Sequence, residues 1–246
     1  MERYGLIGHP LGHSFSAAFF NEKFAREGRD AHYDNYDLET ADELTELVKK
    51  LGDELVGLNV TIPHKQAVIP LLDSLSEEAK AIGAVNVIKR VGETLEGYNT
   101  DVIGFRESLK PLLKPWHTTA FVLGTGGASK AVCHALKQLG IACTLVSRTP
   151  REGVVSYEVL ENELRKNPEV LIVNCTPLGM SPKVDACPPL PYEALNDRTL
   201  LYDLVYNPEE TLFLHNGKAR GASTKNGLEM LRKQAEAAWE IWNGVR

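Results

Sequence analysis

The sequence lacks any apolar run long enough to cross a bilayer, which takes about 20 residues. Its longer apolar stretches, such as residues 170–173 and 200–206, are far too short. The first residues, Met1 to Gly5, also lack the basic start and the long apolar segment of a signal peptide. These absences predict a cytoplasmic protein that does not bind to membranes.

Cysteine is scarce, and basic charge does not dominate. The 246 residues include only four cysteines, and no two of them form a C-x-x-C pair, which argues against a zinc knuckle or a thioredoxin-type site. A chain of this length buries a sizeable core without disulfides. The 27 Lys and Arg residues against 33 Asp and Glu residues leave a net charge of -6, which argues against broad nucleic-acid binding. The seven histidines show no paired ligand spacing, so no metal is predicted.

Short β-branched or apolar runs alternate with helix-like stretches, a pattern typical of α/β proteins with parallel sheets. In the first half we expect a second helix capped by Thr40 and a β-hairpin around Gly92 that forms an antiparallel appendage. The predicted strands of this half are residues 3–8, 32–38, 55–61, 84–90 and 95–99. Its predicted helices are residues 16–27, 41–51 and 77–82, with helical pieces in residues 64–72.

The second half opens after Pro111 and Pro115 and repeats the alternation. Its predicted strands are residues 118–123, 142–147, 170–175 and 200–205. A helix over residues 129–139 ends at Gly140, and an amphipathic helix over residues 227–242 closes the chain. We therefore expect two domains of about equal size.

A glycine turn, Gly124-Thr-Gly126-Gly127-Ala128-Ser129, lies between a predicted strand and a predicted helix. The pyrophosphate of a dinucleotide binds at such a turn, because phosphate oxygens can approach backbone N–H groups at the positive end of the helix. The usual pattern has Gly or Ala at its sixth position, where this chain has Ser129. A tight turn without a ligand is the alternative, and the order of strand, glycines, helix and strand favours the nucleotide.

The end of the next strand distinguishes between the two nicotinamide dinucleotides. NAD sites usually place Asp or Glu there to bind the ribose hydroxyls. This chain has Ser147-Arg148-Thr149 instead, with Arg151 close behind. Because a guanidinium pairs with a 2′-phosphate that a carboxylate would repel, we predict NADP as the cofactor. The alternative is that both arginines are solvated surface charges.

Polar residues gather in three segments of the first half. His13-Ser14-Phe15-Ser16 precedes a helix, where hydroxyl donors and the helix dipole favour a bound carboxylate. Asn59-Val-Thr61-Ile-Pro63-His64-Lys65 ends a buried strand, and Asn86 and Gly97-Tyr-Asn99-Thr100-Asp101 follow. Carboxyl ends of strands are the usual place of sites in open α/β sheets. The alternatives are a plain helix cap, a surface lysine and turn-forming Asn and Asp residues.

The whole set of motifs resembles the shikimate dehydrogenase family. The matching segments, in the family's order from Tyr4 to Gln234, are P-L-G-H-S-F-S, N-V-T-I-P-H-K, G-A-V-N, G-Y-N-T-D, G-T-G-G-A-S-K-A, S-R-T, N-C-T-P-L-G-M and N-G-L-E-M-L-x-x-Q. The resemblance implies an N-terminal catalytic α/β domain and a C-terminal Rossmann-type domain with a cleft between them. The implied domains are residues 1–101 completed by the helix 227–246, and residues 102–226.

The resemblance also implies a role for each candidate residue. Lys65 and Asp101 correspond to the family's catalytic pair. The implied substrate ligands are Ser14 and Ser16 for the carboxylate, Thr61, Asn86 and Gln234 for ring hydroxyls, Asn59 in support, and Tyr206. The implied cofactor ligands are Gly124, Gly126, Gly127, Ala128, Ser147, Arg148, Thr149, Arg151, Thr176 to Met180, and Gly227. The chain departs from the family's common pattern at Ala17, Phe20 and Ser147.

The activity that the resemblance implies is the reversible reduction of 3-dehydroshikimate to shikimate by NADPH, a step toward chorismate and the aromatic amino acids. A quinate/shikimate dehydrogenase that uses NAD is the first alternative, and a catalytically silent nucleotide-binding regulator is the second. Methylene-tetrahydrofolate dehydrogenases are a more distant alternative, but they lack the paired serines Ser14 and Ser16. A monomer and a homodimer fit equally, and Gly104 with Pro111 to Pro115 is a candidate hinge.

Overall fold

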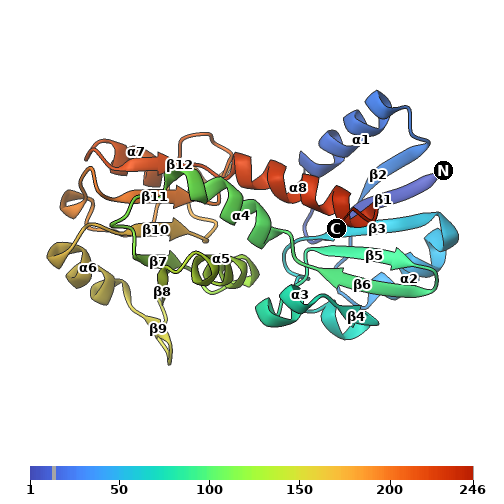
Figure 1. The fold of residues 1–246 in the computed structure, drawn as a ribbon, viewed down its shortest axis with the longest axis horizontal. Helices are drawn as coiled ribbons and strands as arrows, with labels where there is room; N and C mark the ends of the chain where they lie inside the picture. The colour runs from blue at the N-terminus through green and yellow to red at the C-terminus, as the bar shows by residue number, and fades with distance from the viewer. Residues whose placement is uncertain (13–14, 246) are drawn as a thin grey trace. The chain divides into compact units, whose positions relative to one another are not determined.

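A computed structural model describes residues 1–12 and 15–245 of the chain. These residues fall into two units, each with its own dense internal contacts. Unit 1 comprises residues 1–100 together with 235–246, and unit 2 comprises residues 101–234 (Figure 1). The chain thus leaves unit 1 after Thr100 and returns to it at Ala235.

Unit 1 is built on a mixed six-stranded sheet. Its elements are β1 (Glu2–Gly8), α1 (Phe15–Glu27), β2 (Ala31–Asp37), α2 (Glu43–Leu51), β3 (Leu55–Val60), β4 (Ser74–Leu75), α3 (Glu77–Ile82), β5 (Val87–Val91) and β6 (Thr94–Tyr98). The strand order is β2-β1-β3-β5-β6-β4. Strands β1, β2 and β3 are parallel, whereas β5 is antiparallel to both β3 and β6. The predicted hairpin is therefore an integral part of the sheet rather than an appendage.

The last helix, α8 (Leu228–Trp242), supplies part of the core of unit 1. Its Trp242 packs against Tyr4 and Phe20 and donates from Nε1 to the carbonyl of Ile88 at 3.0 Å. A Cβ atom on Gly57 would lie 2.1 Å from Trp242 Nε1, so only glycine leaves room for the indole. Burying an aromatic side chain of this size contributes about 2–3 kcal/mol, so residues 235–242 are essential to the unit.

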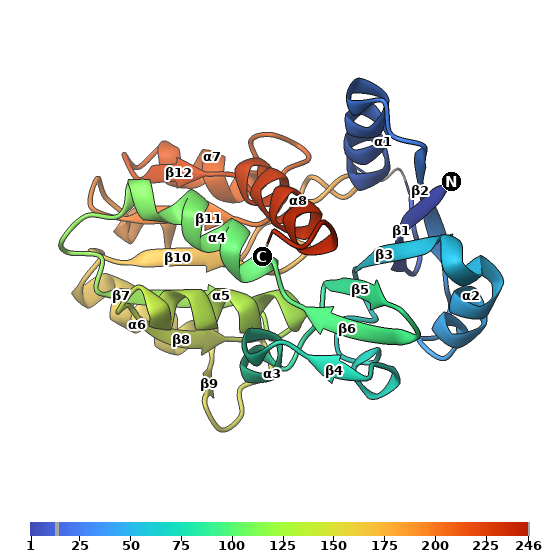
Figure 2. The same ribbon diagram turned by 45° about the vertical axis from the view of Figure 1, so that its right-hand side comes forward.

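Unit 2 is built on an all-parallel six-stranded sheet. Its elements are α4 (Asp101–Leu109), β7 (Thr119–Leu123), α5 (Gly127–Gln138), β8 (Ala142–Val146), β9 (Val154–Val155), α6 (Tyr157–Lys166), β10 (Leu171–Asn174), β11 (Leu200–Asp203), α7 (Leu212–Lys218), β12 (Ser223–Lys225) and the first half of α8. The strand order is β12-β11-β10-β7-β8-β9 (Figures 1 and 2). Counted from β7 this is the 3-2-1-4-5-6 order of doubly wound dinucleotide-binding sheets. The predicted α/β fold with a Rossmann-type second domain is confirmed.

Several boundaries differ from the predicted ones because local hydrogen bonds decide them. Asp42, not Thr40, is the N-cap of α2, and the Thr40 amide instead donates to the Glu43 carboxylate at 2.8 Å. Helix α5 begins at Gly127, two residues before the predicted start. Residues 64–72 form turns and a 3₁₀-helix at Ile69–Leu71 rather than α-helical pieces.

The sequence patterns do not predict α4, α6, α7 or the short strands β4, β9 and β12. Helix α4 shows no amphipathic stripe because it is buried on more than one side, with Val102, Phe105, Ser108 and Leu109 all inaccessible. The three strands span only two or three residues each, too few to show a period.

Gly104 is a packing residue of unit 2. It lies in the buried part of α4, where an added Cβ would meet the carbonyl of Met230 at 2.5 Å and Cβ of Gln234 at 3.0 Å. Only glycine permits this approach of α4 to α8. Gly104 is thus required by packing, while its place in a candidate hinge stays a prediction.

We expect the Gly104→Ala variant to unfold more easily. Alanine favours a helix over glycine by about 1 kcal/mol, but overpacking against a backbone carbonyl costs about 1–3 kcal/mol and cannot be relieved by a rotamer change. Urea titration of the variant should give a lower free energy of unfolding than the wild type. Gly12→Ala, where no atom of the described residues lies within 4 Å of the added Cβ, is the control. A Gly104→Ala protein at least as stable as the wild type would show that the two helices separate freely.

Candidate active site

Tyr33 connects two of the candidate substrate ligands of unit 1. Its hydroxyl donates to Asn59 Oδ1 at 2.7 Å and also hydrogen-bonds the side chain of Ser16. Burial raises the pKa of Tyr33 far above its usual range, so the phenol stays protonated and can donate. Sequence reasoning missed this tyrosine because its strand has the pattern of a polar edge strand. Its aromatic ring, stacked on Phe20, is buried between α1 and the sheet.

Asn86 and Thr100 form a second buried pair in unit 1. The Thr100 amide donates to Asn86 Oδ1 at 2.7 Å, and Asn86 Nδ2 donates to Thr100 Oγ1 at 3.1 Å. Asn59 joins them, since its Nδ2 donates to the Asn86 carbonyl at 3.3 Å. Buried amides need such partners, because an unpaired one costs about 1–3 kcal/mol. The structure thus brings together Ser16, Asn59 and Asn86 through Tyr33 and main-chain bonds.

His64 anchors the turn that carries Thr61 and Lys65. The His64 ring is buried and its Nε2 hydrogen-bonds the Leu38 carbonyl at 2.7 Å. The Lys65 carbonyl accepts from Val85 N–H at 2.7 Å, which ties this turn to the segment that contains Asn86. Lys65 and Thr61 are both half-buried. Neither is a freely solvated surface residue, which was the alternative for Lys65.

Asp101 is the first residue of α4 and directly follows Thr100. A carboxylate at this position is stabilised by the positive end of the helix dipole. The side chain is largely buried, at 6% exposure, so its position is well defined by the protein around it.

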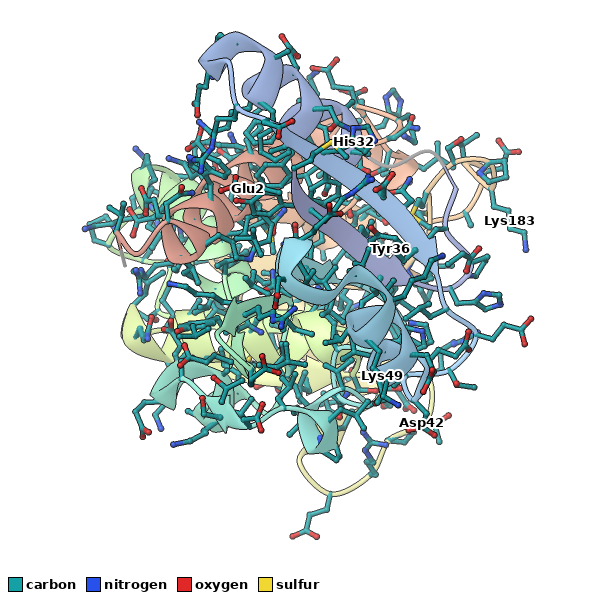
Figure 3. All side chains as sticks on the ribbon, turned by 90° about the vertical axis from the view of Figure 1, so that its right-hand side faces the viewer. Glu2, His32, Tyr36, Asp42, Lys49 and Lys183 are labelled. Carbon is teal, nitrogen blue, oxygen red and sulfur yellow. The ribbon has the colours of Figure 1, made fainter. Side chains whose placement is uncertain are left out.

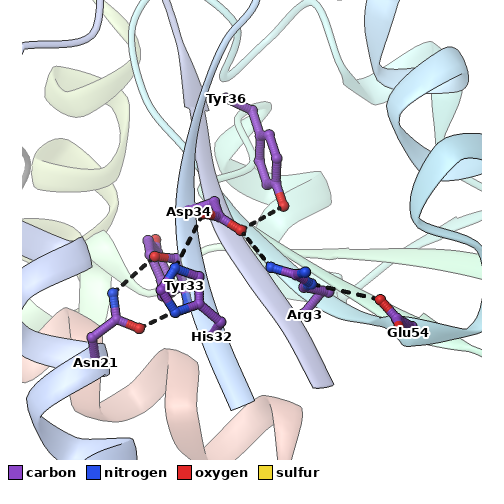
Figure 4. A network of polar contacts seen from close by, with 7 residues as sticks. All are labelled: Arg3, Asn21, His32, Tyr33, Asp34, Tyr36 and Glu54. Carbon is purple, nitrogen blue, oxygen red and sulfur yellow. Dashed lines mark hydrogen bonds and ion pairs between the residues drawn. The ribbon is translucent and has the colours of Figure 1, made fainter. Parts of the chain in front are cut away.

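Helix α1, which carries Ser16, is fixed to β2 by Asn21. The Asn21 side chain exchanges two hydrogen bonds of 2.9 Å with the backbone N–H and C=O of Tyr33 (Figure 4). On the same strand, Asp34 accepts from Arg3 and Tyr36 at 3.2 Å each. Figure 3 shows His32 and Tyr36 projecting from β2. These bonds orient the edge strand and, through it, the helix start.

In unit 2 the two loops at the reversal of strand order meet directly. The chain turns away from β7 at Gly124, whose φ of +103° favours glycine. An added Cβ there would lie 3.2 Å from Thr176 Cγ2, on the loop that follows β10. In doubly wound sheets the crevice between these two loops is where a nucleotide binds.

The start of α5 fits a pyrophosphate. Gly126 is its N-cap, and in the described part of the chain no other atom lies within 4 Å of the Cβ that another residue would place there. Ser129 occupies the sixth position of the glycine pattern, where Gly or Ala is usual. It donates from Oγ to the Gly126 carbonyl at 2.7 Å and so closes the turn. Gly127 and Ala128 form the first turn, whose backbone N–H groups can bind an anion.

The residues after β8 fit a phosphate on the adenosine ribose. Ser147 Oγ accepts from the Thr149 N–H at 3.2 Å, which forms a turn with Arg148 and Thr149 exposed. The backbone of Arg151 forms a bridge with Val154, so its side chain starts from a fixed point. Across residues 1–12 and 15–245, no acidic side chain forms an ion pair with Arg148 or Arg151.

A buried carboxylate, missed by sequence reasoning, organises the Thr176–Met180 loop. Asp203, at the end of β11, accepts from Asn174 Nδ2 and Val205 N–H at 3.0 Å each and from Thr211 Oγ1 at 2.6 Å. Asn174 Oδ1 in turn accepts from the Thr176 N–H at 3.0 Å and its hydroxyl at 2.6 Å. Desolvation raises the pKa of Asp203 to about 6, although these bonds oppose the rise. An aspartate that directly ends an apolar strand is the signal that could have revealed it.

The other candidates of unit 2 have varied surroundings. Tyr206 and Met180 are exposed at 38% and 49%. Gly227 is required by packing, since an added Cβ would lie 2.1 Å from the Leu204 carbonyl. Gln234 is buried in α8 and donates from Nε2 to the Leu231 carbonyl at 3.0 Å. Ser14 lies outside the described residues.

The described part of the chain contains neither a membrane-spanning helix nor a metal cluster. In residues 1–12 and 15–245, no helix is both long and apolar enough to cross a membrane. Within the same residues, no three His, Cys, Asp or Glu side chains are grouped so that they could hold a metal ion.

Unit 2 has a glycine turn at the point where the strand order of its all-parallel sheet reverses, and unit 1 is an α/β unit with buried polar side chains. These features define the class of two-unit α/β proteins with a Rossmann-type nucleotide-binding sheet. Comparison with known proteins narrows this class. The profile of the shikimate dehydrogenase substrate binding domain matches residues 6–88. The NADP(+)-dependent shikimate dehydrogenase of Caldanaerobacter subterraneus is 38% identical over 98% of this chain and 91% of that protein. The chain belongs to the shikimate dehydrogenase family.

Solved structures agree over nearly the full length. Shikimate 5-dehydrogenase from Thermus thermophilus in complex with NADP(H) and shikimate superposes with a TM-score of 0.86 at 36% identity, covering 99% of this chain and 94% of that one. A chorismate mutase/shikimate 5-dehydrogenase fusion protein from Clostridium acetobutylicum gives a TM-score of 0.87 at 38% identity, covering 99% and 91%. Both structures share the fold described above.

We expect the Asp203→Asn variant to change how stability depends on pH. The folded protein holds a proton on Asp203 up to a pH of about 6, whereas the unfolded chain releases it near the ordinary pKa of 3.8. Between these values the unfolded state binds fewer protons, so this group lowers the free energy of unfolding as pH rises, by about 3 kcal/mol in total.

Urea unfolding at intervals from pH 4 to 7 checks this expectation. The wild type should lose stability relative to Asp203→Asn across that window, while the exposed control Asp197→Asn should run parallel to the wild type. Parallel curves for wild type and Asp203→Asn would mean that the buried carboxyl titrates normally.

Proposed function

We propose that the protein is an NADP-dependent shikimate dehydrogenase that interconverts shikimate and 3-dehydroshikimate, within the synthesis of aromatic compounds. One observation carries the proposal: 38% identity over 98% of the chain with an enzyme that bears this activity in its name. The Thermus thermophilus relative binds NADP(H) and shikimate together, which supports the same pair of ligands here.

The reduction needs a proton donor at the C3 carbonyl oxygen, where negative charge builds up as the ketone becomes an alcohol. When bound, NADPH supplies the hydride. In our proposal the Lys65 ammonium donates the proton to that oxygen and stabilises its charge, and Asp101 orients Lys65 and binds a neighbouring hydroxyl. The half-buried position of Lys65 and the buried position of Asp101 support these roles, since low exposure strengthens charge interactions.

In this proposal the substrate is held mostly by polar groups of unit 1, with Tyr206 and Gln234 contributed by unit 2. Ser14 and Ser16 bind the carboxylate, because hydroxyl donors near a helix start favour an anion. Thr61, Asn86 and Gln234 bind ring hydroxyls, with Asn59 in support and Tyr206 beside the carboxylate. The tight hydrogen bonding of Asn59 and Asn86 supports such a preorganised site.

The cofactor is held by the second domain in this proposal. Gly124, Gly126, Gly127 and Ala128 receive the pyrophosphate at the start of α5. Ser147, Arg148, Thr149 and Arg151 face the 2′-phosphate. The loop from Thr176 to Met180, together with Gly227, lines the nicotinamide side, and the hydrogen bonds of Asp203 and Asn174 hold that loop in place.

An assay with purified protein tests the activity. We expect NADPH to form rapidly from shikimate plus NADP, and NADH to form much more slowly from quinate plus NAD. The reverse preference would assign the protein to the NAD-dependent quinate/shikimate enzymes. NADPH binding without turnover of either acid would reveal a regulatory nucleotide-binding protein.

Removing the proposed proton donor should reduce turnover. We expect Lys65→Ala to lower kcat by about 10²–10⁴-fold with a much smaller change in KM, as for the loss of a general acid. Lys50→Ala, at an exposed lysine of the same unit, is the matched control and should keep full activity. Near-normal kcat in Lys65→Ala would refute the role of Lys65.

Removing the proposed phosphate ligand should weaken NADP specifically. We expect Arg148→Ala to raise KM for NADP by about 10–100-fold, the value of one charge-assisted hydrogen bond, and to leave KM for NAD nearly unchanged. Arg220→Ala, at an exposed arginine of the same unit, should affect neither cofactor. Equal losses for both cofactors would place Arg148 away from the 2′-phosphate.

A further inference from the structure

Two cysteines that play no part in the proposed reaction lie in contact in unit 2. Cys133 is on α5 and Cys143 is on β8, and their Sγ atoms are 2.7 Å apart. Helix α5 lies along β7 and β8 (Figure 2), so the contact joins two neighbouring elements of one unit. Both side chains are half-buried, which leaves them partly open to solvent.

The two sulfurs are not equivalent. The hydrogen bond between them lowers the pKa of Cys133 and raises that of Cys143, so Cys133 takes the thiolate form first. A thiolate is the nucleophile in thiol–disulfide exchange, and a second thiol in contact with it can resolve the mixed disulfide. The pair therefore has an attacking sulfur and a resolving sulfur.

We propose that Cys133 and Cys143 are a dithiol modification site, which small-molecule disulfides such as glutathione disulfide convert into an intramolecular disulfide. The sulfurs need to approach only from 2.7 Å to the bond length of about 2.05 Å, so the change requires little backbone movement.

The exchange takes place in two balanced steps. The Cys133 thiolate attacks one sulfur of glutathione disulfide, forming a mixed disulfide and releasing one glutathione as a thiolate. Cys143 then loses its proton and attacks the Cys133 sulfur, forming the protein disulfide and releasing the second glutathione. Two protein thiols are oxidised and one glutathione disulfide is reduced to two thiols.

The other two cysteines are less suited to this chemistry. Desolvation raises the pKa of Cys175 far above its usual range, which disfavours its thiolate, although this side chain is half-buried like those of the pair. Cys187 accepts a hydrogen bond from Asn216 Nδ2 at 3.8 Å, on another part of the unit. The site is thus specific to one pair among the four.

Mass spectrometry of the full-length protein tests the proposal. Reduced protein, freed of reductant and incubated with glutathione disulfide, should lose the mass of two hydrogens, and proteolytic peptides should show Cys133 linked to Cys143. A linkage through Cys175 or Cys187, a stable glutathione adduct, or no change would overturn the proposal.

Single serine variants separate the two roles. Cys143→Ser should accumulate one glutathione on Cys133, because no resolving thiol remains, and Cys133→Ser should react far more slowly. The matched control Cys187→Ser should form the disulfide as the wild type does. Faster glutathione addition to Cys143 than to Cys133 in these variants would contradict the assignment of attacking and resolving sulfurs.

Thermal unfolding gives a readout independent of enzyme activity. The disulfide closes the loop from Cys133 to Cys143 and restricts the unfolded chain, so the oxidised protein should have a Tm about 5 °C or more above the reduced protein. Dithiothreitol should reverse the shift, and Cys133→Ser should not show it. A lower Tm after oxidation would mean that the bond strains the fold, contrary to the proposal.

Discussion

Buried polar groups that satisfy one another at the carboxyl ends of the strands are the constraint on which both units depend. A buried amide or carboxyl without a partner would favour an open, hydrated loop, so each must be paired for the strand ends to stay closed. Asn59 is paired by Tyr33 in unit 1, and Asp203 is paired by Asn174 and Thr211 in unit 2. The loops that carry chemistry extend from these paired anchors, which is how a rigid sheet positions a site on irregular backbone.

Repeating patterns in the sequence are sufficient to predict the larger part of the fold. Each strand of four or more residues is predicted, because most of these strands are apolar runs bounded by turn residues, although β2 is polar. Helix α4 could not be predicted, since burial on several sides removes the polar face that marks a helix. Helix α6 buries only Leu160 and Leu164, so its apolar stripe is short. The order of the strands depends on contacts that no local pattern contains.

In the candidate site, too, some residues can be predicted from the sequence and others cannot. Glycines and charged residues at strand ends are visible in the sequence because their positions relative to the predicted strands carry the signal. The residues that hold them in place are not visible in this way: Tyr33 and Asn174 act through partners far along the chain or within a loop. The packing role of Gly104 is hidden for the same reason, since its requirement for glycine arises from Met230 on a distant helix.

The return of α8 to unit 1 has a consequence for the order in which the chain folds during synthesis. Unit 2 is continuous from residue 101 to 234, so its core can close while the ribosome is still adding residues. Unit 1 must wait for Trp242 to pack against Gly57, although residues 1–100 are synthesised before unit 2. The nascent residues 1–100 therefore expose an apolar surface until residues 235–242 have been synthesised, and chaperones have access to that surface throughout this interval.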